Sequence, residues 1–354
     1  MKYFRSVDEL LFYKEPESFN KYSDKNLLKY AIGANMYMPG TQKNVFEKLI
    51  GNQFREVGAI TLCCEDAIPA SEVAAAEDNI LRLLEGLFWR CEKDRTLFDQ
   101  LPLLFIRVRN PEQFRRLAKK LNGCHLKMLC GFNFPKFQSL NGDSYFSILK
   151  ELSEAHDEPL YGMPILEDCS LIYKETRFAE LEKIQEILKQ YSEYVLNIRV
   201  GGTDFSSCFG LRRSVESTIY DVRVVADCFI DILNFFLRKG LDYVVSGPVW
   251  EYFSYDEGSP EIRGLVRELK LDIENGFHGK TIIHPSQVNV VNKQYAVDYH
   301  EYQDAVGILE CDGGVFKGSA GNRMNEVGPH QSWARKILAR AKVFGVLEEH
   351  TKIV

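Results

Sequence analysis

The chain has 354 residues, of which 45% are hydrophobic, with 44 Lys and Arg against 50 Asp and Glu. These ordinary globular values exclude a disordered chain, a collagen and a disulfide-dense miniprotein. The formal charge of −6 argues against broad binding to nucleic acid or to an anionic membrane.

The cysteines and the N-terminus indicate the compartment. The nine cysteines form no CxxC pair, and most sit in apolar runs, so we expect free, buried thiols in a reducing cytoplasm. The N-terminal residues lack the apolar core of a signal peptide, so we expect no export signal. The chain has no uncharged apolar run of about 18 residues, so we expect no membrane span.

Eight short apolar runs alternate with longer amphipathic stretches along the chain. The runs cover residues 27–39, 59–67, 101–109, 126–136, 160–168, 194–204, 242–250 and 279–287. Because they are nearly continuous rather than alternating, they are typical of parallel strands covered on both faces. The stretches between them have helical periodicity, and several begin with Ser or Pro, as helices often do.

The number of these units predicts the fold. A chain of this length fits two domains or one α/β barrel, and eight β/α units over about 260 residues favour a (β/α)₈ TIM barrel. An open doubly wound sheet is the alternative, but no GxGxxG or Walker A turn is present. A Gly-rich loop at 311–330 and a basic amphipathic helix from residue 331 predict a C-terminal helical extension or lid. We therefore expect an N-terminal extension at 1–27, the barrel at 28–297, and the lid and helix at 298–354.

Ionisable residues stand at six of the eight predicted strand ends. In chain order they are Glu65 with Asp66, Arg107 with Arg109, Lys136, Glu167 with Asp168, Asp204, and His284. A lone carboxylate at such a position usually caps a helix or is solvated. Because the carboxyl ends of barrel strands meet at one rim, the joint pattern predicts an active site there.

Two of these residues, Glu167 and Asp204, close neighbouring strands. Carboxylates from adjacent strands, with positions left for water and substrate, suit Mg²⁺, although a structural pair bonded to loop amides is the alternative. Of Arg107 and Arg109 we expect only one to face the mouth, where it would clamp a substrate carboxylate. For His284 we favour a rim-orienting role over that of a general base.

Several blocks of the sequence resemble the citrate lyase β-subunit branch of the HpcH/HpaI aldolase/citrate lyase superfamily. The segments AITLCCEDA, FIRVRNP, FPK, PILED and RVGGTDF are similar to that family's strand ends, and GFHGKTIIHPSQ is the most specific block. GSAGNRMNEV with the helix after it resembles the family's lid. The blocks occur in the family's order and span about residues 28–346.

The resemblance implies a Mg²⁺-dependent carbon–carbon lyase or aldolase acting on a small hydroxy or oxo acid, with or without a coenzyme A thioester. It places Glu167 and Asp204 as metal ligands, Arg107 as the carboxylate-binding residue and Asp66 near the metal waters. Further candidate substrate contacts are Glu65, Lys136, Gly202, Thr203 and His284. Relatives form trimers or hexamers through the C-terminal segment, so a homo-oligomer is expected.

The lid departs from the family pattern. Asn325 stands where coenzyme A-dependent relatives carry an aspartate that acts as general base on a neighbouring subunit. Asn325 cannot transfer a proton, so either Glu326 replaces the aspartate, or the reaction differs, or activity is lost. The alternatives are therefore related enolate chemistry, such as acyl-CoA thioester hydrolysis or condensation, and a non-catalytic barrel.

Overall fold

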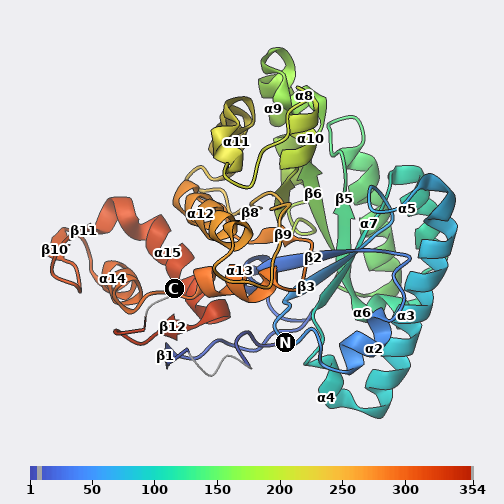
Figure 1. Cartoon of the computed structure of the whole chain (residues 1–354), viewed down its shortest axis with the longest axis horizontal. Coiled ribbons are helices and arrows are strands. Elements are labelled where there is room, and N and C mark those ends of the chain that lie inside the picture. The colour runs from blue at the N-terminus through green and yellow to red at the C-terminus, as the bar shows by residue number, and fades with distance from the viewer. Residues whose placement is uncertain (6–9, 352–354) are drawn as a thin grey trace.

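The computed structural model describes residues 1–5 and 10–351 of the chain. Eight parallel strands form a closed barrel surrounded by helices, which confirms the predicted TIM barrel (Figure 1). In chain order these strands are β2 Ala34–Pro39, β3 Ala59–Cys63, β4 Leu103–Arg107, β5 Leu129–Phe134, β6 Tyr161–Leu166, β7 Ile198–Val200, β8 Val245–Ser246 and β9 Lys280–Ile282. Strand β9 pairs with β2, and a parallel bridge between Gly247 and Lys280 joins the end of β8 to β9, so the ring is complete.

The outer helices begin at the capping residues that their sequences offer. Asn110 accepts a hydrogen bond from the Gln113 amide at 2.8 Å, with Pro111 as the first helical residue, and Ser259 with Pro260 repeats this arrangement. The helices of the barrel layer are α1 Lys25–Ala31, α2 Val45–Ile50, α3 Val73–Lys93, α4 Arg95–Phe98, α5 Pro111–Ala118, α6 Gly123–Met128, α7 Gly142–His156, α8 Cys169–Ile172, α9 Lys174–Gln190, α10 Gly202–Ser207, α11 Arg223–Phe236, α12 Pro260–Asn275 and α13 Gln287–Tyr295.

Several predicted strands are partly wrong because they extend into helices; residues 126–128 of the run 126–136, for example, belong to α6. In the first, over 27–39, only residues 34–39 are extended, because Asp24 caps helix α1 and the apolar residues Leu28 and Ala31 lie on its buried face. In the run 194–204, strand β7 ends at Val200 and α10 begins at Gly202. Asp204 therefore lies in the first turn of a helix rather than at a strand end.

The C-terminal segment forms two helices that enclose a hairpin. Helix α14 Tyr299–Glu310 and helix α15 Val327–Phe344 pack together, and β10 Val315–Lys317 pairs with β11 Met324–Glu326. The predicted loop at 311–330 is thus wrong over these two strands and over residues 327–330, because α15 begins at Val327 rather than at residue 331. Asp304, which is almost fully buried, accepts from the Ser319 amide at 2.6 Å and pairs with Arg323 at 2.5 Å, so it fixes the hairpin on α14.

The N-terminal residues join the C-terminal ones. Tyr3 is fully buried, stacks on Phe344 with ring centroids 4.5 Å apart and donates to the Ala31 carbonyl at 2.7 Å. Strand β1 Phe12–Lys14 pairs antiparallel with β12 Val346–Leu347. The two ends of the chain therefore lie on one side of the barrel, as Figure 1 shows, and the hairpin β10–β11 projects beyond them. The domain boundaries at 27/28 and 297/298 stay a prediction.

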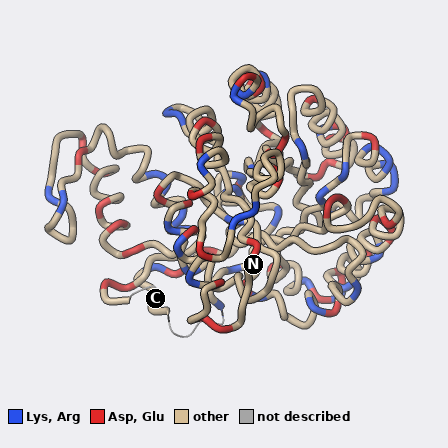
Figure 2. The backbone as a smooth tube through the Cα atoms, turned by 45° about the horizontal axis from the view of Figure 1, so that its top comes forward, with Lys and Arg blue, Asp and Glu red and all other residues tan. Residues whose placement is uncertain are grey.

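The surface carries no single dominant charge. Lysine and arginine are interspersed with aspartate and glutamate along the outer helices (Figure 2). Of the helices within the described ranges, none is both long enough and apolar enough to cross a membrane.

Candidate active site

Six of the predicted residues converge at the carboxyl ends of strands β3 to β7. We call them the rim cluster: Glu65, Asp66, Arg107, Lys136, Glu167 and Asp204. They come from five consecutive strand ends, and they meet because parallel strands of a barrel all end at the same face. Four carboxylates thus share the rim with two cations.

Arg107, the last residue of β4, is at the centre of the cluster. Its Nη2 lies 2.8 Å from Glu65 Oε2, 3.2 Å from Asp66 Oδ2 and 2.9 Å from Glu167 Oε1. Its side chain is 9% exposed, and those of Glu65 and Glu167 are also buried, so water screens these two ion pairs poorly. Arg109 follows the strand end and instead approaches the Cys64 carbonyl at 3.5 Å. Arg107 is therefore the arginine that faces the carboxylates.

Lys136 bridges the two sides of the cluster. Its Nζ lies 2.7 Å from Glu65 Oε1, and its backbone amide donates to Glu167 Oε1 at 3.0 Å. Lys136 adopts the left-handed conformation, with φ at +47°, which non-glycine residues rarely do. Such strain persists where neighbouring contacts impose it, often at functional sites.

The carboxylates of the cluster differ in proton affinity. Burial raises the pKa of Glu65, and its hydrogen bond with Asp66 raises it further. For Asp66 burial acts in the same direction, but hydrogen bonding with Glu65 and the charges of Arg107 and Lys136 outweigh it and lower the pKa. Burial raises the pKa of Glu167 to about 7 despite Arg107, and the negative charge of Asp204 adds to this rise.

Glu167 and Asp204 approach each other beside Gly201. A Cβ atom built on Gly201 would lie 2.6 Å from Glu167 Oε2 and 3.4 Å from Asp204 Oδ2, so both oxygens line the space that glycine leaves open. Glu167 Oε1 is used by Arg107 and by the Lys136 amide, whereas Oε2 faces this space.

These residues fit a Mg²⁺ ion. Mg²⁺ prefers oxygen ligands and is commonly held by one or two carboxylates, with water and substrate oxygens completing the octahedron. Among the described residues no group of three or more His, Cys, Asp and Glu side chains is arranged to hold a metal. A Mg²⁺ ion at this rim would take the carboxylates of Glu167 and Asp204 as its two protein ligands. The excess of rim carboxylates over rim cations also favours a divalent cation.

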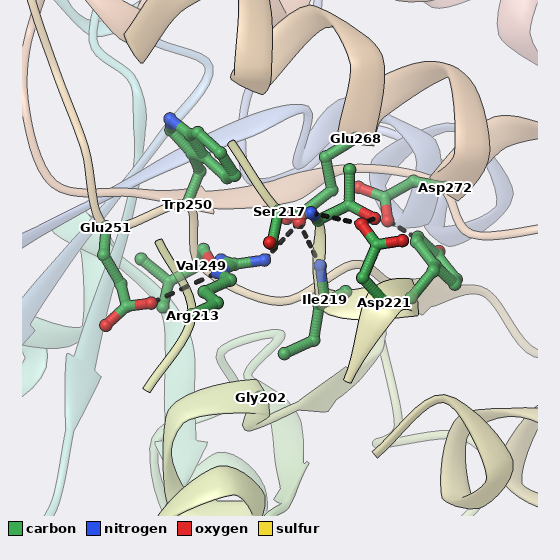
Figure 3. A network of polar contacts seen from close by, with 12 residues as sticks. Gly202, Arg213, Ser217, Ile219, Asp221, Val249, Trp250, Glu251, Glu268 and Asp272 are labelled. Atoms are coloured by element: carbon green, nitrogen blue, oxygen red, sulfur yellow. Dashed lines mark hydrogen bonds and ion pairs between the residues drawn. The ribbon is translucent and has the colours of Figure 1, made fainter. Parts of the chain in front are cut away.

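A buried network of polar contacts surrounds Arg213 and Glu268 (Figure 3). Lys280, fully buried, lies 2.9 Å from Glu268 Oε1 and 2.6 Å from Asp272 Oδ2. Arg213 also pairs with Glu268, and the same carboxylate accepts from the Ile219 amide at 2.7 Å. The segment between α10 and α11 is thereby fixed to α12 and β9.

The other predicted site residues lie around the rim cluster or outside it. Gly202 is buried, and a Cβ there would lie 3.0 Å from Pro248 Cβ, whereas Thr203 is exposed. His284 stacks on Phe253 at 4.2 Å, and its Nδ1 lies 2.9 Å from Ser286 Oγ and 3.3 Å from the Ser286 amide nitrogen. These contacts suit the rim-orienting role expected for His284. The structure does not bring Glu326 to the rim cluster of its own chain, because β11 belongs to the projecting hairpin (Figure 1).

The sequence reasoning missed a polar layer inside the barrel. Arg199 of β7 is 1% exposed and donates to Thr281 Oγ1 at 2.6 Å, yet its Nε and Nη1 have no hydrogen-bond partner among the described residues. Its guanidinium lies 5.8 Å from the ring centroid of Tyr37, whose hydroxyl accepts from Asn133 Nδ2 at 2.5 Å. A charged residue inside the apolar run VLNIRV was the available signal. Arginine does not deprotonate in proteins, so Arg199 places a positive charge in the barrel interior.

Comparison with known proteins places this geometry in context. Residues 26–346 match the family model described as a carbon–carbon bond lyase of the TIM-barrel fold. Human mitochondrial citramalyl-CoA lyase is 24% identical over 285 residues, which cover 74% of this chain and 70% of that protein. A citrate lyase from Burkholderia xenovorans has the same fold, with a TM-score of 0.63 at 15% identity, over 89% of this chain and 93% of that one. CitE from Mycobacterium tuberculosis, solved with magnesium, acetoacetate and coenzyme A, has a TM-score of 0.55 at 18% identity. The match covers 89% of this chain and 99% of that one.

Proposed function

Because the chain belongs to the carbon–carbon bond lyases of the TIM-barrel fold, we propose that it cleaves a small hydroxy or oxo acid in a Mg²⁺-dependent reaction. The observation that carries this proposal is the convergence of Arg107 with Glu167 and Asp204 at one rim. The citramalyl-CoA lyase relative and the magnesium bound by CitE of M. tuberculosis support it.

The roles of the rim cluster follow from its chemistry. Mg²⁺, when bound by Glu167 and Asp204, supplies Lewis-acid chemistry at a substrate oxygen. Arg107 binds the substrate carboxylate and fixes its orientation, since a guanidinium presents paired donors to a carboxylate. Glu65 holds Arg107 in place through their ion pair, and Lys136 in turn holds Glu65. A base removes the proton of the substrate hydroxyl, the adjacent carbon–carbon bond breaks, and its electron pair becomes that of an enolate.

The test of this function is a product search. The protein is incubated with Mg²⁺ and a panel of 3-hydroxy acids and 2-oxo acids, each free and as its coenzyme A thioester, and the products are identified by mass spectrometry. Two fragments whose formulae sum to that of the substrate are expected. A free acid plus coenzyme A indicates thioester hydrolysis instead, and a heavier product indicates condensation. No turnover of any panel member favours the non-catalytic barrel.

We further propose that Glu326 of a neighbouring subunit supplies the base in a homo-oligomer, either a trimer or a hexamer. In strand β11 the side chain of Asn325 is buried, whereas that of Glu326 is exposed. Of these two residues, only Glu326 is accessible to another subunit, and only Glu326 can accept a proton. Light scattering is expected to give the mass of a trimer or a hexamer, and a monomer would contradict this part of the proposal.

A complementation experiment tests the shared site. Glu167→Gln and Glu326→Gln are each expected to be inactive, but co-expression of the two forms should restore activity. With random assembly, about a quarter of the sites combine an intact Glu167 with an intact Glu326 from the neighbour. Activity in the Glu326→Gln protein alone would exclude Glu326 as the base. Absence of recovery in verified mixed oligomers would exclude a base supplied in trans.

A groove beside the rim supports a coenzyme A thioester as the substrate. It has a volume of about 1030 Å³ and runs from Tyr255 and Ser286, in the loops that follow β8 and β9, along α12 and α13. Its cationic lining consists of Arg263, Arg267, Lys270 and Lys293, against the carboxylates Glu257 and Glu274. A groove that combines apolar side chains with four cations suits a pantetheine chain and its nucleotide phosphates.

Coenzyme A alone is therefore expected to bind this groove. By calorimetry, reversing charge in the double variant Lys270→Glu/Lys293→Glu should weaken coenzyme A binding by about tenfold or more, because two phosphate-facing charges are inverted. The matched control is Lys239→Glu, an exposed lysine outside the groove, which should leave binding unchanged. Equal affinity in the groove variant and the control would remove the groove from the proposal.

A further inference from the structure

Two cysteines lie in contact beside the rim cluster. Cys169 Sγ and Cys208 Sγ are 2.8 Å apart, and both residues are free thiols. Among the nine cysteines, all of which the structure describes, five are buried as expected, whereas Cys169 is exposed and Cys208 is partly exposed. The expectation of buried thiols is therefore wrong for this pair.

Each of the two cysteines lies a few residues after one of the proposed metal ligands. Cys169 is the first residue of α8, two residues after Glu167, and Cys208 directly follows α10, four residues after Asp204. The elements that carry the two proposed metal ligands thus meet at these sulfurs. A disulfide needs a sulfur–sulfur distance of about 2.05 Å, so the bond requires less than about 1 Å of further approach.

We propose that Cys169 and Cys208 form a reversible disulfide that joins the loop after β6 to the end of α10. This inference does not depend on the reaction that the enzyme catalyses. It adds a modification site that links the two elements bearing Glu167 and Asp204.

The oxidant for this step is a peroxide. Cys169 is the more exposed thiol and reacts first: peroxide oxidises its sulfur to a sulfenic acid and is reduced to water. Cys208 then attacks the Cys169 sulfur, the S–O bond breaks, and the oxygen leaves as a second water with the proton of the Cys208 thiol. A dithiol reductant reverses the reaction by exchange.

The difference in exposure between the two thiols favours oxidation of Cys169 first. Cys208 is only partly exposed, so an external oxidant reaches its sulfur less readily than that of the exposed Cys169. Cys208 is therefore less reactive towards an external oxidant but lies next to the sulfur that an oxidant meets. This is the arrangement of a reactive cysteine with a resolving partner.

Peptide mapping under non-reducing conditions tests the proposal. After brief treatment of the folded, full-length protein with hydrogen peroxide, the peptides containing Cys169 and Cys208 are expected to be linked, with the loss of two hydrogens, and a dithiol should separate them. The melting temperature should rise by about 5 °C, because the bond closes a long loop in the unfolded chain.

Two variants make the test specific. In Cys208→Ser, Cys169 should accumulate as a sulfenic acid that a dimedone probe traps, and the rise in melting temperature should disappear. Cys311→Ser removes the other exposed cysteine and should leave the cross-link intact. The proposal is overturned if no 169–208 peptide forms, or if it forms equally fast in urea, where the fold no longer holds the sulfurs together.

Discussion

Glu167→Gln is expected to lower the affinity for Mg²⁺ by at least about 100-fold, because it removes one of two carboxylate ligands from a hard cation. The amide is nearly isosteric, and its oxygen can still accept from the Lys136 amide, as Glu167 Oε1 does at 3.0 Å. Arg107 keeps Glu65 and Asp66 as partners. The fold should therefore persist, and cleavage activity should fall in parallel with Mg²⁺ binding.

Calorimetric titration with MgCl₂ measures this effect directly. Glu182→Gln, on the exposed face of α9, is the matched control and should bind Mg²⁺ like the unmodified protein. Circular dichroism and the melting temperature establish that both variants are folded. Unchanged Mg²⁺ affinity in folded Glu167→Gln would remove the metal assignment, and it would leave Glu167 as a structural partner of Arg107.

The strand ends were the predictable part of the site. Arg107, Glu167 and Asp204 could be found because short apolar runs mark parallel strands, and the carboxyl ends of such strands meet at one face. The placement of Asp204 in α10 rather than in β7 did not matter, since the first turn of that helix directly follows the strand.

The interior of the barrel could not be predicted in the same way. The partners of Arg199 are Thr281 and Tyr37, which come from strands far from it in the sequence, so no local pattern indicates their contact. The Cys169–Cys208 pair has the same character, because its two residues belong to different β/α units. Such contacts depend on which strands are neighbours and on the stagger between them.

The lid was predicted as a loop because glycine and polar residues dominate its sequence. The two strands of its hairpin have only three residues each, which is too short for a periodic signal. The contacts that fix the hairpin come from Asp304, on the preceding helix, to Ser319 and Arg323. A helix residue thus determines the structure of a segment whose own sequence has little preference.

The buried network around Lys280 gives the largest expected effect on stability. Lys280→Met should reduce the free energy of unfolding by about 3–5 kcal/mol, since removing one partner of a buried ion pair leaves an uncompensated charge. The uncompensated charge is that of Asp272, because Glu268 keeps its ion pair with Arg213, whereas Asp272 keeps the hydrogen bond from the Tyr220 hydroxyl at 2.7 Å but no cation among the described residues. Urea unfolding measures the loss, and Lys270→Met, at an exposed position of the same helix as Glu268, should change stability by less than about 0.5 kcal/mol.

The pH dependence of the Lys280→Met defect distinguishes charge from packing. Burial already raises the pKa of Asp272 in the folded protein, and Lys280 opposes this rise, so the variant should raise it further. A carboxyl whose pKa is raised in the folded state binds its proton more tightly there than in the unfolded chain. The free energy of unfolding therefore falls as the pH rises above the pKa of the unfolded chain. The loss of stability in Lys280→Met should therefore be small near pH 4 and largest above neutral pH.

The double variant Lys280→Met/Asp272→Asn, which removes the unpaired charge, should recover part of this lost stability at pH 8. A defect that is equal at all pH values, with no recovery in the double variant, would show that the lysine stem stabilises β9 by packing alone.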